Sequence, residues 1–412
     1  MEKKKKPAIR FKGFTDSWEQ RKLGDVVNRV TRKNQDLVSE LPLTISAQYG
    51  LIDQNEFFDK RVASKDVSGY YLIENGEFAY NKSTSTDAPW GAVKRLDHYE
   101  NGVLSTLYIV FGIKENNPID SNFLVSYYNT NLWHKGIREI AAEGARNHGL
   151  LNIVPADFFE TELMIPQDIE EQKQIGKFFK ELEALITLHQ RKYDKLQIIK
   201  KAMLEKMFPQ NGSCFPEIRF KGFTDSWEQR KLGELGEIMT GSTPSTSKSE
   251  YYSEDGIPWV TPTDINSQTI SDTPRKLSGE GIKVGRVVPA NTILCTCIAS
   301  IGKNTLLTVK GSFNQQINCL TPNEYNDAYF LLTESEIWSN IMKRMAAAGT
   351  MQIVNKTEFS ELTTMVPKLE EQKKIGQYFH TIGHLITLHQ RMQKNSKQYI
   401  ITMKCILNNI KY

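Results

Sequence analysis

The sequence IRFKGFTDSWEQRKLG, at Ile9–Gly24, occurs again without a single change at Ile218–Gly233. Two shorter motifs also occur twice further along the chain: EEQK at Glu170–Lys173 and Glu370–Lys373, and LITLHQR at Leu185–Arg191 and Leu385–Arg391. The chain is therefore a tandem repeat of one unit of roughly 200 residues. Because the segments between the matching motifs share very little, we infer a common frame that presents two different recognition surfaces.

The composition is that of an ordinary globular protein. The 412 residues are 39% hydrophobic and 24% charged, which leaves room for two to four domains. No apolar run approaches the ~18 residues that cross a bilayer, and the basic start MEKKKKPAIRF lacks the apolar stretch of a secretory signal. We therefore expect a cytoplasmic protein without a membrane segment. Cys295 and Cys297 lie in the apolar run TILCTCIAS and are predicted to be buried in a strand.

The net charge of +4 is small and unevenly distributed. Residues 1–166 carry 21 basic and 22 acidic side chains, and residues 216–366 carry 14 and 17. Neither segment has the basic excess that drives nucleic-acid binding by bulk electrostatics. Any DNA binding must use local patches or be assisted by a partner.

The predicted architecture is α+β, with strand-rich segments alternating with long helices. Short apolar and aromatic stretches separated by turn residues, such as Val103–Ile113 and Val287–Gly302, favour strands. The predicted boundaries are 1–166 for the first strand-rich domain, 167–209 for the first helix, 210–366 for the second domain and 367–412 for the second helix. Asp168 followed by Glu171 predicts a capping box at the start of the first helix.

Both helices carry apolar residues with alternating spacings of four and three, which is typical of a coiled-coil seam. The predicted seam comprises Ile175, Phe179, Leu182, Ile186 and His189 in the first helix and Ile375, Phe379, Ile382, Ile386 and His389 in the second. The alternative is that each helix packs on its own domain. If a pseudo-two-fold axis relates the repeats, the helices form an antiparallel coiled coil. His189 and His389 could then meet as a polar layer that fixes the register.

Several segments together resemble the specificity (S) subunit of type I restriction-modification systems, over essentially the whole chain. The strongest match is the repeated FKGFTDSWEQRKLG segment, followed by the starts of the two helices and an opening of the second domain: Phe11–Asp25, Phe220–Glu234, PQDIEEQKQIGKFF at Pro166–Phe179, PKLEEQKKIGQYF at Pro367–Phe379, and Gly241–Ile265. The resemblance implies two target-recognition domains, each reading one half of a bipartite site in double-stranded DNA, with the helices as a spacer.

The same resemblance implies partners and a division of labour. Two modification (methyltransferase) subunits would bind the frame and methylate adenine with S-adenosylmethionine. Restriction subunits would add ATP-dependent translocation and cleavage. The S subunit itself would be a non-catalytic reader without a metal or cofactor. The sequence agrees with this, since it lacks Asn-Pro-Pro-Tyr, a complete phosphate loop (SIGKN at Ser300–Asn304 is a poor match) and H-E-x-x-H. His380 and His384 have metal-pair spacing, but no third ligand is evident.

Candidate DNA-reading residues are Arg, Lys, Asn, Gln and similar donors beside small or turn residues, where exposed loops are expected. They are Asn81, Lys82, Lys94, Arg95, Arg146, Asn147 and His148 in the first domain, and Lys303, Asn304, Asn314, Gln315, Gln316, Thr350 and Gln352 in the second. The Ser/Thr-rich segment Gly241–Ser249 is a candidate for backbone contacts. For each candidate, the alternative is an ordinary solvated loop.

The identical Ile9–Gly24 and Ile218–Gly233 segments cannot distinguish two half-sites. A structural role at the junction of domain and helix, and docking of the modification subunit, both remain open for them. Two other functions also remain open for the chain: a free-standing DNA-binding regulator, and a scaffold that does not bind DNA.

Overall fold

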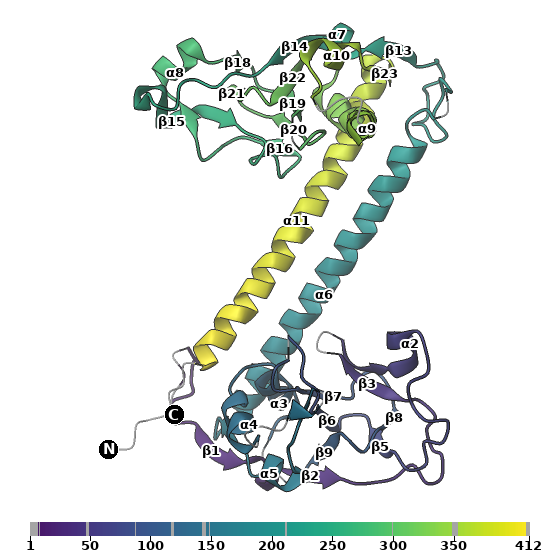
Figure 1. Cartoon of the computed structure of the whole chain (residues 1–412), viewed down its shortest axis with the longest axis vertical. Coiled ribbons are helices and arrows are strands. Elements are labelled where there is room, and N and C mark those ends of the chain that lie inside the picture. Colours follow the sequence, from purple (N-terminus) through teal and green to yellow (C-terminus); the bar gives the residue numbers. More distant parts are fainter. Residues whose placement is uncertain are drawn as a thin grey trace. The chain divides into compact units, whose positions relative to one another are not determined.

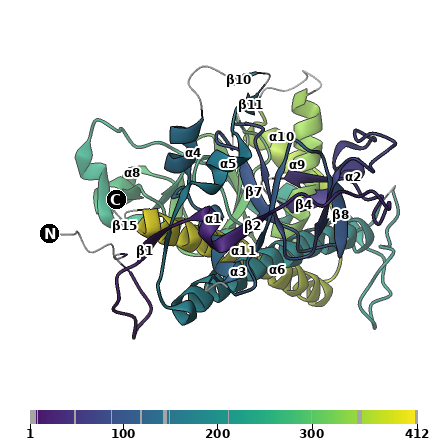
Figure 2. The same cartoon turned by 90° about the horizontal axis from the view of Figure 1, so that it is seen from below.

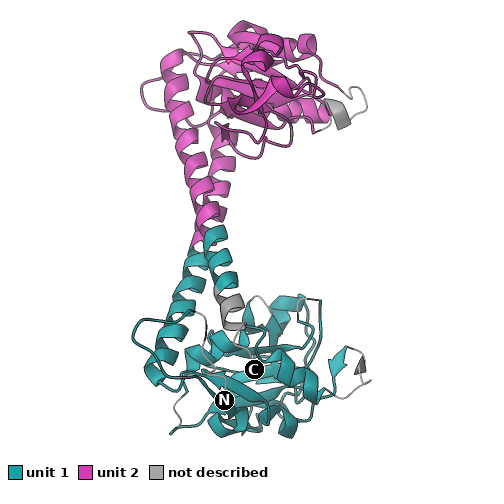
Figure 3. Cartoon of the chain, turned by 90° about the vertical axis from the view of Figure 1, so that its left-hand side faces the viewer, with its two compact units in different colours: residues 1–188, 393–412 teal, residues 189–392 magenta. Residues whose placement is uncertain are grey.

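The computed structural model divides into two compact units, residues 1–188 with 393–412, and residues 189–392 (Figure 3). The structure describes residues 7, 9–46, 49–86, 88–116, 119–141, 146–147, 149–210, 212–298, 300–347 and 353–408. None of the helices in these ranges is both long and apolar enough to cross a membrane.

The first unit is built around a four-stranded antiparallel sheet in the order β2-β9-β6-β7. Its strands are β2 (Val27–Val30), β9 (Ile109–Ile113), β6 (Phe78–Asn81) and β7 (Ala92–Arg95). Four further strand pairs surround it: β1 (Glu19–Lys22) with β12 (Glu162–Ile165), β3 (Leu43–Ser46) with β4 (Gly50–Asp53), β5 (Tyr71–Glu74) with β8 (Asn101–Leu104), and β10 (Arg146–Asn147) with β11 (Leu150–Leu151). The short helices are α1 (Leu23–Val26), α2 (Gln54–Phe58), α3 (Ser121–Tyr128), α4 (His134–Ile140) and α5 (Pro155–Phe159).

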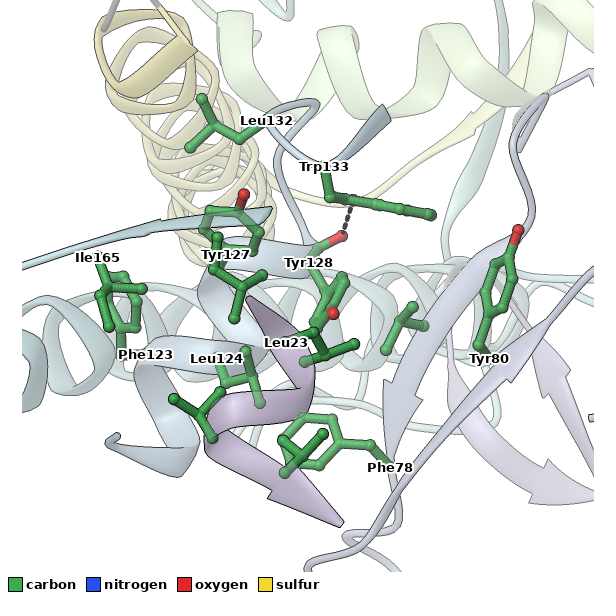
Figure 4. Packing of buried hydrophobic residues seen from close by; sticks show 14 of the residues in the cluster. Leu23, Phe78, Tyr80, Phe123, Leu124, Tyr127, Tyr128, Leu132, Trp133 and Ile165 are labelled. Carbon is green, nitrogen blue, oxygen red and sulfur yellow. Dashed lines mark hydrogen bonds between the residues drawn. The ribbon is translucent and has the colours of Figure 1, made fainter. Parts of the chain in front are cut away.

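Aromatic side chains from the sheet and the short helices form the main core of this unit (Figure 4). Tyr80 of β6 stacks on Phe158 of α5 with ring centroids 4.7 Å apart. Trp133 donates its indole N–H to the carbonyl oxygen of Tyr128 at 3.0 Å, so its polar atom is satisfied inside the core. The sheet and the helices α3–α5 thus share one packed interior.

The second unit contains two mixed sheets. One has the order β14-β22-β19-β20-β16, with β14 (Gly236–Thr240), β22 (Ile317–Pro322), β19 (Thr292–Thr296), β20 (Asn304–Leu307) and β16 (Thr269–Ile270). The other has the order β17-β15-β21-β18, with β17 (Lys276–Leu277), β15 (Tyr252–Val260), β21 (Gly311–Phe313) and β18 (Val287–Val288). The remaining elements are the pair β13 (Glu228–Lys231) and β23 (Thr363–Val366), and the helices α7 (Leu232–Leu235), η1 (Ser249–Tyr251), α8 (Gly279–Val284), α9 (Ala328–Ala347) and α10 (Lys356–Glu361).

Strand β19 is buried on both faces. Ile293 and Cys295 belong to the cluster that includes α9, whereas Leu294 belongs to a separate cluster on the opposite face. Cys295 and Cys297 are 0% and 2% exposed, so the prediction that they are buried is confirmed.

Two long helices, α6 (Ile169–Lys206) and α11 (Leu369–Asn408), pack against each other (Figures 1 and 2). In the second unit they are antiparallel. His189 of α6 contacts His389 of α11, whereas Phe208, which follows α6, contacts Phe379, ten residues earlier in α11. The α+β class, the two strand-rich units and the packed long helices confirm the predicted fold. The residues of the proposed seam are buried or half-buried, whereas Leu185, Leu188, Leu385 and Leu388 between them are exposed.

The predicted capping box at the start of α6 is wrong, although Asp168 does cap the helix. Asp168 does accept a hydrogen bond from the backbone N–H of Glu170, at 2.8 Å. The two carboxylate oxygens of Glu171 instead accept hydrogen bonds from Arg10. Two parallel hydrogen bonds from a guanidinium to a carboxylate are stronger than the single hydrogen bond from a backbone N–H that a capping box would supply.

Candidate nucleic-acid interface

The constant segments meet inside each unit through a buried ion pair. Arg10 donates from Nε and Nη2 to the two carboxylate oxygens of Glu171, at 2.5 and 2.6 Å. In the second copy Arg219 binds Glu371 in the same bidentate way, at 2.7 and 2.7 Å. Both glutamates are buried, and the hydrogen bonds raise the pKa of both arginines. The identical Arg-Phe-Lys-Gly and Glu-Glu-Gln motifs therefore act as two halves of one clamp.

The next residue of the motif connects the clamp to the recognition part of each unit. The side-chain oxygen of Gln172 accepts the backbone N–H of Asp120 at 2.9 Å, and that of Gln372 accepts the N–H of Asp327 at 2.9 Å. Asp120 and Asp327 in turn cap the first turns of α3 and α9. One motif thus fixes the start of a long helix and the start of a helix in the strand-rich part.

Glycines allow the close approach that these contacts need. A Cβ atom on Gly176 would lie 2.5 Å from the backbone nitrogen of Phe123, and one on Gly376 would lie 2.7 Å from that of Phe330. These contacts give the constant segments the structural role that the sequence left open.

The two histidines of the proposed seam face each other in the second unit. Their Nδ1 atoms are 2.9 Å apart, so the Nδ1–H of one ring must donate a hydrogen bond to the unprotonated Nδ1 of the other. The contact therefore needs at least one neutral ring. Burial lowers the pKa of His389, and the nearby His189 and Lys192 lower it further.

The candidates at the end of β6 lie beside a second segment of the first unit. Asn81 accepts a hydrogen bond from the backbone N–H of Ser83 at 2.9 Å, which shapes the turn after the strand. The carbonyl oxygen of Lys82 accepts the N–H of Leu151 at 3.0 Å, and Ser83 bridges to Leu150. This places the half-buried Lys82 next to the β10–β11 hairpin.

That hairpin contains two further candidates. Arg146 and Asn147 form strand β10, which pairs with β11, and His148 lies outside the described residues. The structure therefore brings the backbones of two predicted clusters together, the one after β6 and the one around Arg146.

The candidates on β7, which pairs with β6, have hydrogen-bond partners within the unit. Lys94 donates to the side-chain oxygen of Asn129 at 2.9 Å. Arg95 binds Asp97 at 2.7 Å, Ser121 at 2.7 Å and Asn122 at 3.1 Å, so it connects the strand to α3. An arginine with this many partners would have to exchange them in order to reach a base edge.

In the second unit, the turn after β21 carries three candidates. Asn314 is buried, and its side chain exchanges hydrogen bonds with Gln316 at 3.1 Å. Gln315 is exposed and accepts a hydrogen bond from the hydroxyl of Thr243. Thr243 belongs to the Ser/Thr-rich segment Gly241–Ser249, so the structure brings this segment and the glutamine turn to one surface.

The last candidates lie beside α9. Asn304 donates from its side-chain nitrogen to the carbonyl oxygen of Ser335 at 2.8 Å and to the hydroxyl of Ser339 at 2.6 Å. Its neighbour Lys303 lines a cavity of about 500 Å³. Thr350 and Gln352 lie outside the described residues.

Sequence reasoning missed two lysines at this cavity. Lys200 of α6 and Lys343 of α9 line it together with Lys303. Lys200 lies 14 residues after Ile186, at the same position of the heptad pattern as this seam residue. A charged residue in an otherwise apolar heptad series was the signal that could have found it.

The described residues contain no group of three or more His, Cys, Asp or Glu side chains placed to hold a metal ion. The ring of His380, one of the two histidines with metal-pair spacing, lies against the ring of Tyr329 with centroids 4.2 Å apart.

Comparison with known proteins gives a consistent picture. A family model described as the type I restriction modification DNA specificity domain matches residues 15–197 and 224–397. The chain is 29% identical over 214 residues to the type I restriction enzyme HindI specificity subunit of Haemophilus influenzae, which covers 50% of this chain and 46% of that protein. It thus spans about half the length of the first curated relatives that it matches.

Two further similarities extend over nearly the whole chain. A putative type I restriction enzyme MjaX specificity subunit of Methanocaldococcus jannaschii is 22% identical over 407 residues, or 95% of this chain and 92% of that one. The crystal structure of a type I restriction-modification system S subunit from M. genitalium matches with a TM-score of 0.65 at 13% identity, over 97% of this chain and 98% of that one. At this identity the structural match shows a shared fold.

Proposed function

Because the chain belongs to the type I restriction modification DNA specificity family, we propose that it is the non-catalytic specificity subunit of a type I restriction-modification complex in the cytoplasm. Each strand-rich unit reads one half of a bipartite target in double-stranded DNA. The long helices set the spacing and bind two modification subunits, and restriction subunits complete the assembly.

One observation carries this proposal. The same clamp, Arg10 with Glu171 and Arg219 with Glu371, supports two strand-rich units whose sheets differ in strand number and order. A single frame with two dissimilar surfaces suits a protein that must read two unrelated half-sites. A scaffold that does not bind DNA would have no need for this combination.

Exposed leucines support the docking of two equivalent partners. Leu185 and Leu188 are 45% and 44% exposed on α6, and Leu385 and Leu388 are 36% and 42% exposed on α11. They come from the identical LITLHQR motif, so each helix presents the same apolar pair. Two copies of one modification subunit would bury two such pairs in the same way.

The function is tested by expressing the chain with its modification subunit in a host that lacks DNA methylation. Single-molecule sequencing should then reveal methyladenine in a two-part motif with a fixed gap, and the motif should disappear without this chain. A stable complex that methylates nothing would argue against the proposal.

Docking is tested separately by native mass spectrometry of purified complexes. Leu188→Asp should give complexes with one modification subunit, and Leu188→Asp with Leu388→Asp should give none. Ile198→Asp is the matched control, because Ile198 is also on α6 and is 70% exposed, but lies outside the motif. Full occupancy in the double variant would exclude these leucines as the docking surface.

A further inference from the structure

The polar cavity of the second unit has features that its role as part of a frame does not explain. It has a volume of about 500 Å³, within the usual range of ligand sites. Its walls come from four places in the sequence: α6, α9, the loop at residues 265–268 and the turn at residues 302–304.

Three lysines from three of these elements line the cavity: Lys200, Lys303 and Lys343. Among the described residues that line it, Glu336 is the one acid, and it forms an ion pair with Lys200. The cavity therefore carries a formal charge of +2, although residues 216–366, which supply all of its described lining except Lys200, carry more acidic than basic side chains. This concentration of positive charge is the local patch that the bulk composition could not show.

Lys200 is a charged residue at a position where the other copy of the repeat has a buried apolar side chain. In the repeat it corresponds to Ile400 of α11, which is 8% exposed and belongs to the core of the first unit. Lys200 instead brings an ammonium group to the cavity, and its side chain is 19% exposed. An apolar residue at this position would extend the core, so the lysine indicates a binding role.

The turn that carries Lys303 is held in place by α9. Gly302 has a φ of +79°, and a Cβ there would lie 2.9 Å from Cε of Lys343. The side-chain nitrogen of Asn304 is committed to Ser335 and Ser339, and the described residues supply no hydrogen-bond partner for its oxygen. Asn304 would have to give up these two hydrogen bonds in order to make the bidentate contact that reads adenine, whereas its oxygen can orient an ammonium group or a water molecule.

From this geometry we infer that the cavity is a phosphate-binding site and that it holds the sugar-phosphate backbone of the target DNA. Lysine ammonium groups bind phosphate as point charges, and a contact to a phosphate carries no base information. Lys200, Lys303 and Lys343 thus position the duplex, while exposed side chains such as Gln315 remain available to read bases. This inference rests on the proposed function, since it names a contact made by the same DNA.

The test uses the chain assembled with its modification subunits, and measures DNA affinity at several salt concentrations. Lys343→Met should weaken binding equally for the target and for duplexes altered in either half-site. Each lost phosphate contact lowers the slope of log K against log salt by about 0.9, so the ratio of wild-type to variant affinity should shrink about 3.5-fold between roughly 50 and 200 mM salt.

Glu336→Gln gives the opposite result, which misfolding cannot imitate. It removes the acid and releases Lys200, so DNA binding should become tighter and its salt dependence steeper. Lys231→Met is the matched control for charge loss, because Lys231 is on β13 and pairs with Glu361 away from the cavity. Its salt slope should equal that of the wild type.

The outcomes separate the possible failures. If the wild-type complex binds no DNA, the proposed function itself fails. If it binds, and Lys343→Met and Glu336→Gln keep the wild-type affinity and slope, the phosphate site is overturned. A third result would assign the cavity to a free phosphate compound. In that case pyrophosphate or ADP would bind the free chain saturably in calorimetry, and Lys343→Met would abolish this binding without changing the affinity for DNA. The assignment to DNA would then be overturned.

Discussion

At the scale of single residues, the repeated motifs place ionised side chains where water is excluded. Glu371 is 1% exposed and depends on Arg219 for both of its carboxylate oxygens. Such a pair contributes little net stability compared with apolar residues of the same size, but removal of one partner leaves a buried charge. The clamp therefore contributes more to the specific geometry of the junction between the long helix and the constant segment than to the stability of the fold.

Arg219→Met alone should lower the free energy of unfolding of the second unit by about 3–5 kcal/mol, because Glu371 remains buried without a partner. The double variant with Glu371→Met should recover most of this loss. Urea unfolding of both variants measures the difference. A double variant as unstable as the single one would show that the guanidinium does more than balance this charge.

Glu334 of α9 is a buried acid of a different kind. Its described partner is the hydroxyl of Thr364, which donates at 2.6 Å, and burial raises the pKa of Glu334 to about 8. The folded chain therefore holds a proton that the unfolded chain releases above its ordinary pKa of 4.5. By linkage, stability falls as pH rises from 4.5 to about 8 and is independent of this group above that range.

Glu334→Gln should remove this pH dependence. The variant should be more stable than the wild type at pH 8 by a few kcal/mol, since one pKa unit corresponds to about 1.4 kcal/mol. Near pH 5 the two proteins should have similar stability. Thermal unfolding across this range is the measurement, and parallel curves at all pH values would show that Glu334 is ionised in the folded chain.

At the scale of elements, the packing faces of the two long helices could be predicted best from the sequence. The heptad positions of α6 and α11 depend on residues close in sequence, so periodicity alone placed Phe179, Ile186 and Ile382 on one face. The ring contact between His189 and His389 follows once the helices are antiparallel. The Arg10–Glu171 pair spans 161 residues and could not be predicted, since no local pattern marks which acid a distant arginine will meet.

The ends of the helices differ between the copies. Phe208, just after α6, is fully buried against Trp227 and Phe379, with ring centroids 5.8 and 5.7 Å away. In the first unit the equivalents Trp18 and Phe179 line a cavity of about 180 Å³. The repeat therefore predicts that Phe208 fills a space that the described residues of the first copy leave open.

Phe208→Ala should reopen that space and destabilise the second unit by about 3–5 kcal/mol. Phe215→Ala is the matched control, because Phe215 is 53% exposed in the following linker and should change stability by less than about 0.5 kcal/mol. Denaturant unfolding of both variants gives the comparison. Equal effects would mean that Phe208 contributes no more than a surface residue.

At the scale of the whole molecule, the repeat and the fold class followed from the sequence, whereas the candidate interface followed only in part. Lys82 and the strand at Arg146 come together because β6 and the β10–β11 hairpin are neighbours in space. Arg95 resembles a DNA-reading residue in sequence, yet it connects a strand to α3. Which donors remain available is decided by tertiary contacts between distant segments, and these leave no periodic signal.

The proposal that the two units read the two half-sites independently gives the last prediction. Gln315 lies in the second unit and Lys82 in the first, and each is anchored by contacts within its own unit. Gln315→Ala should relax the methylated motif in one half, and Lys82→Ala should affect the other half, because base contacts act locally. Methyladenine mapping with each variant shows which half changes. If one substitution relaxed both halves, the units would not read separately, and the two-reader function would have to be abandoned.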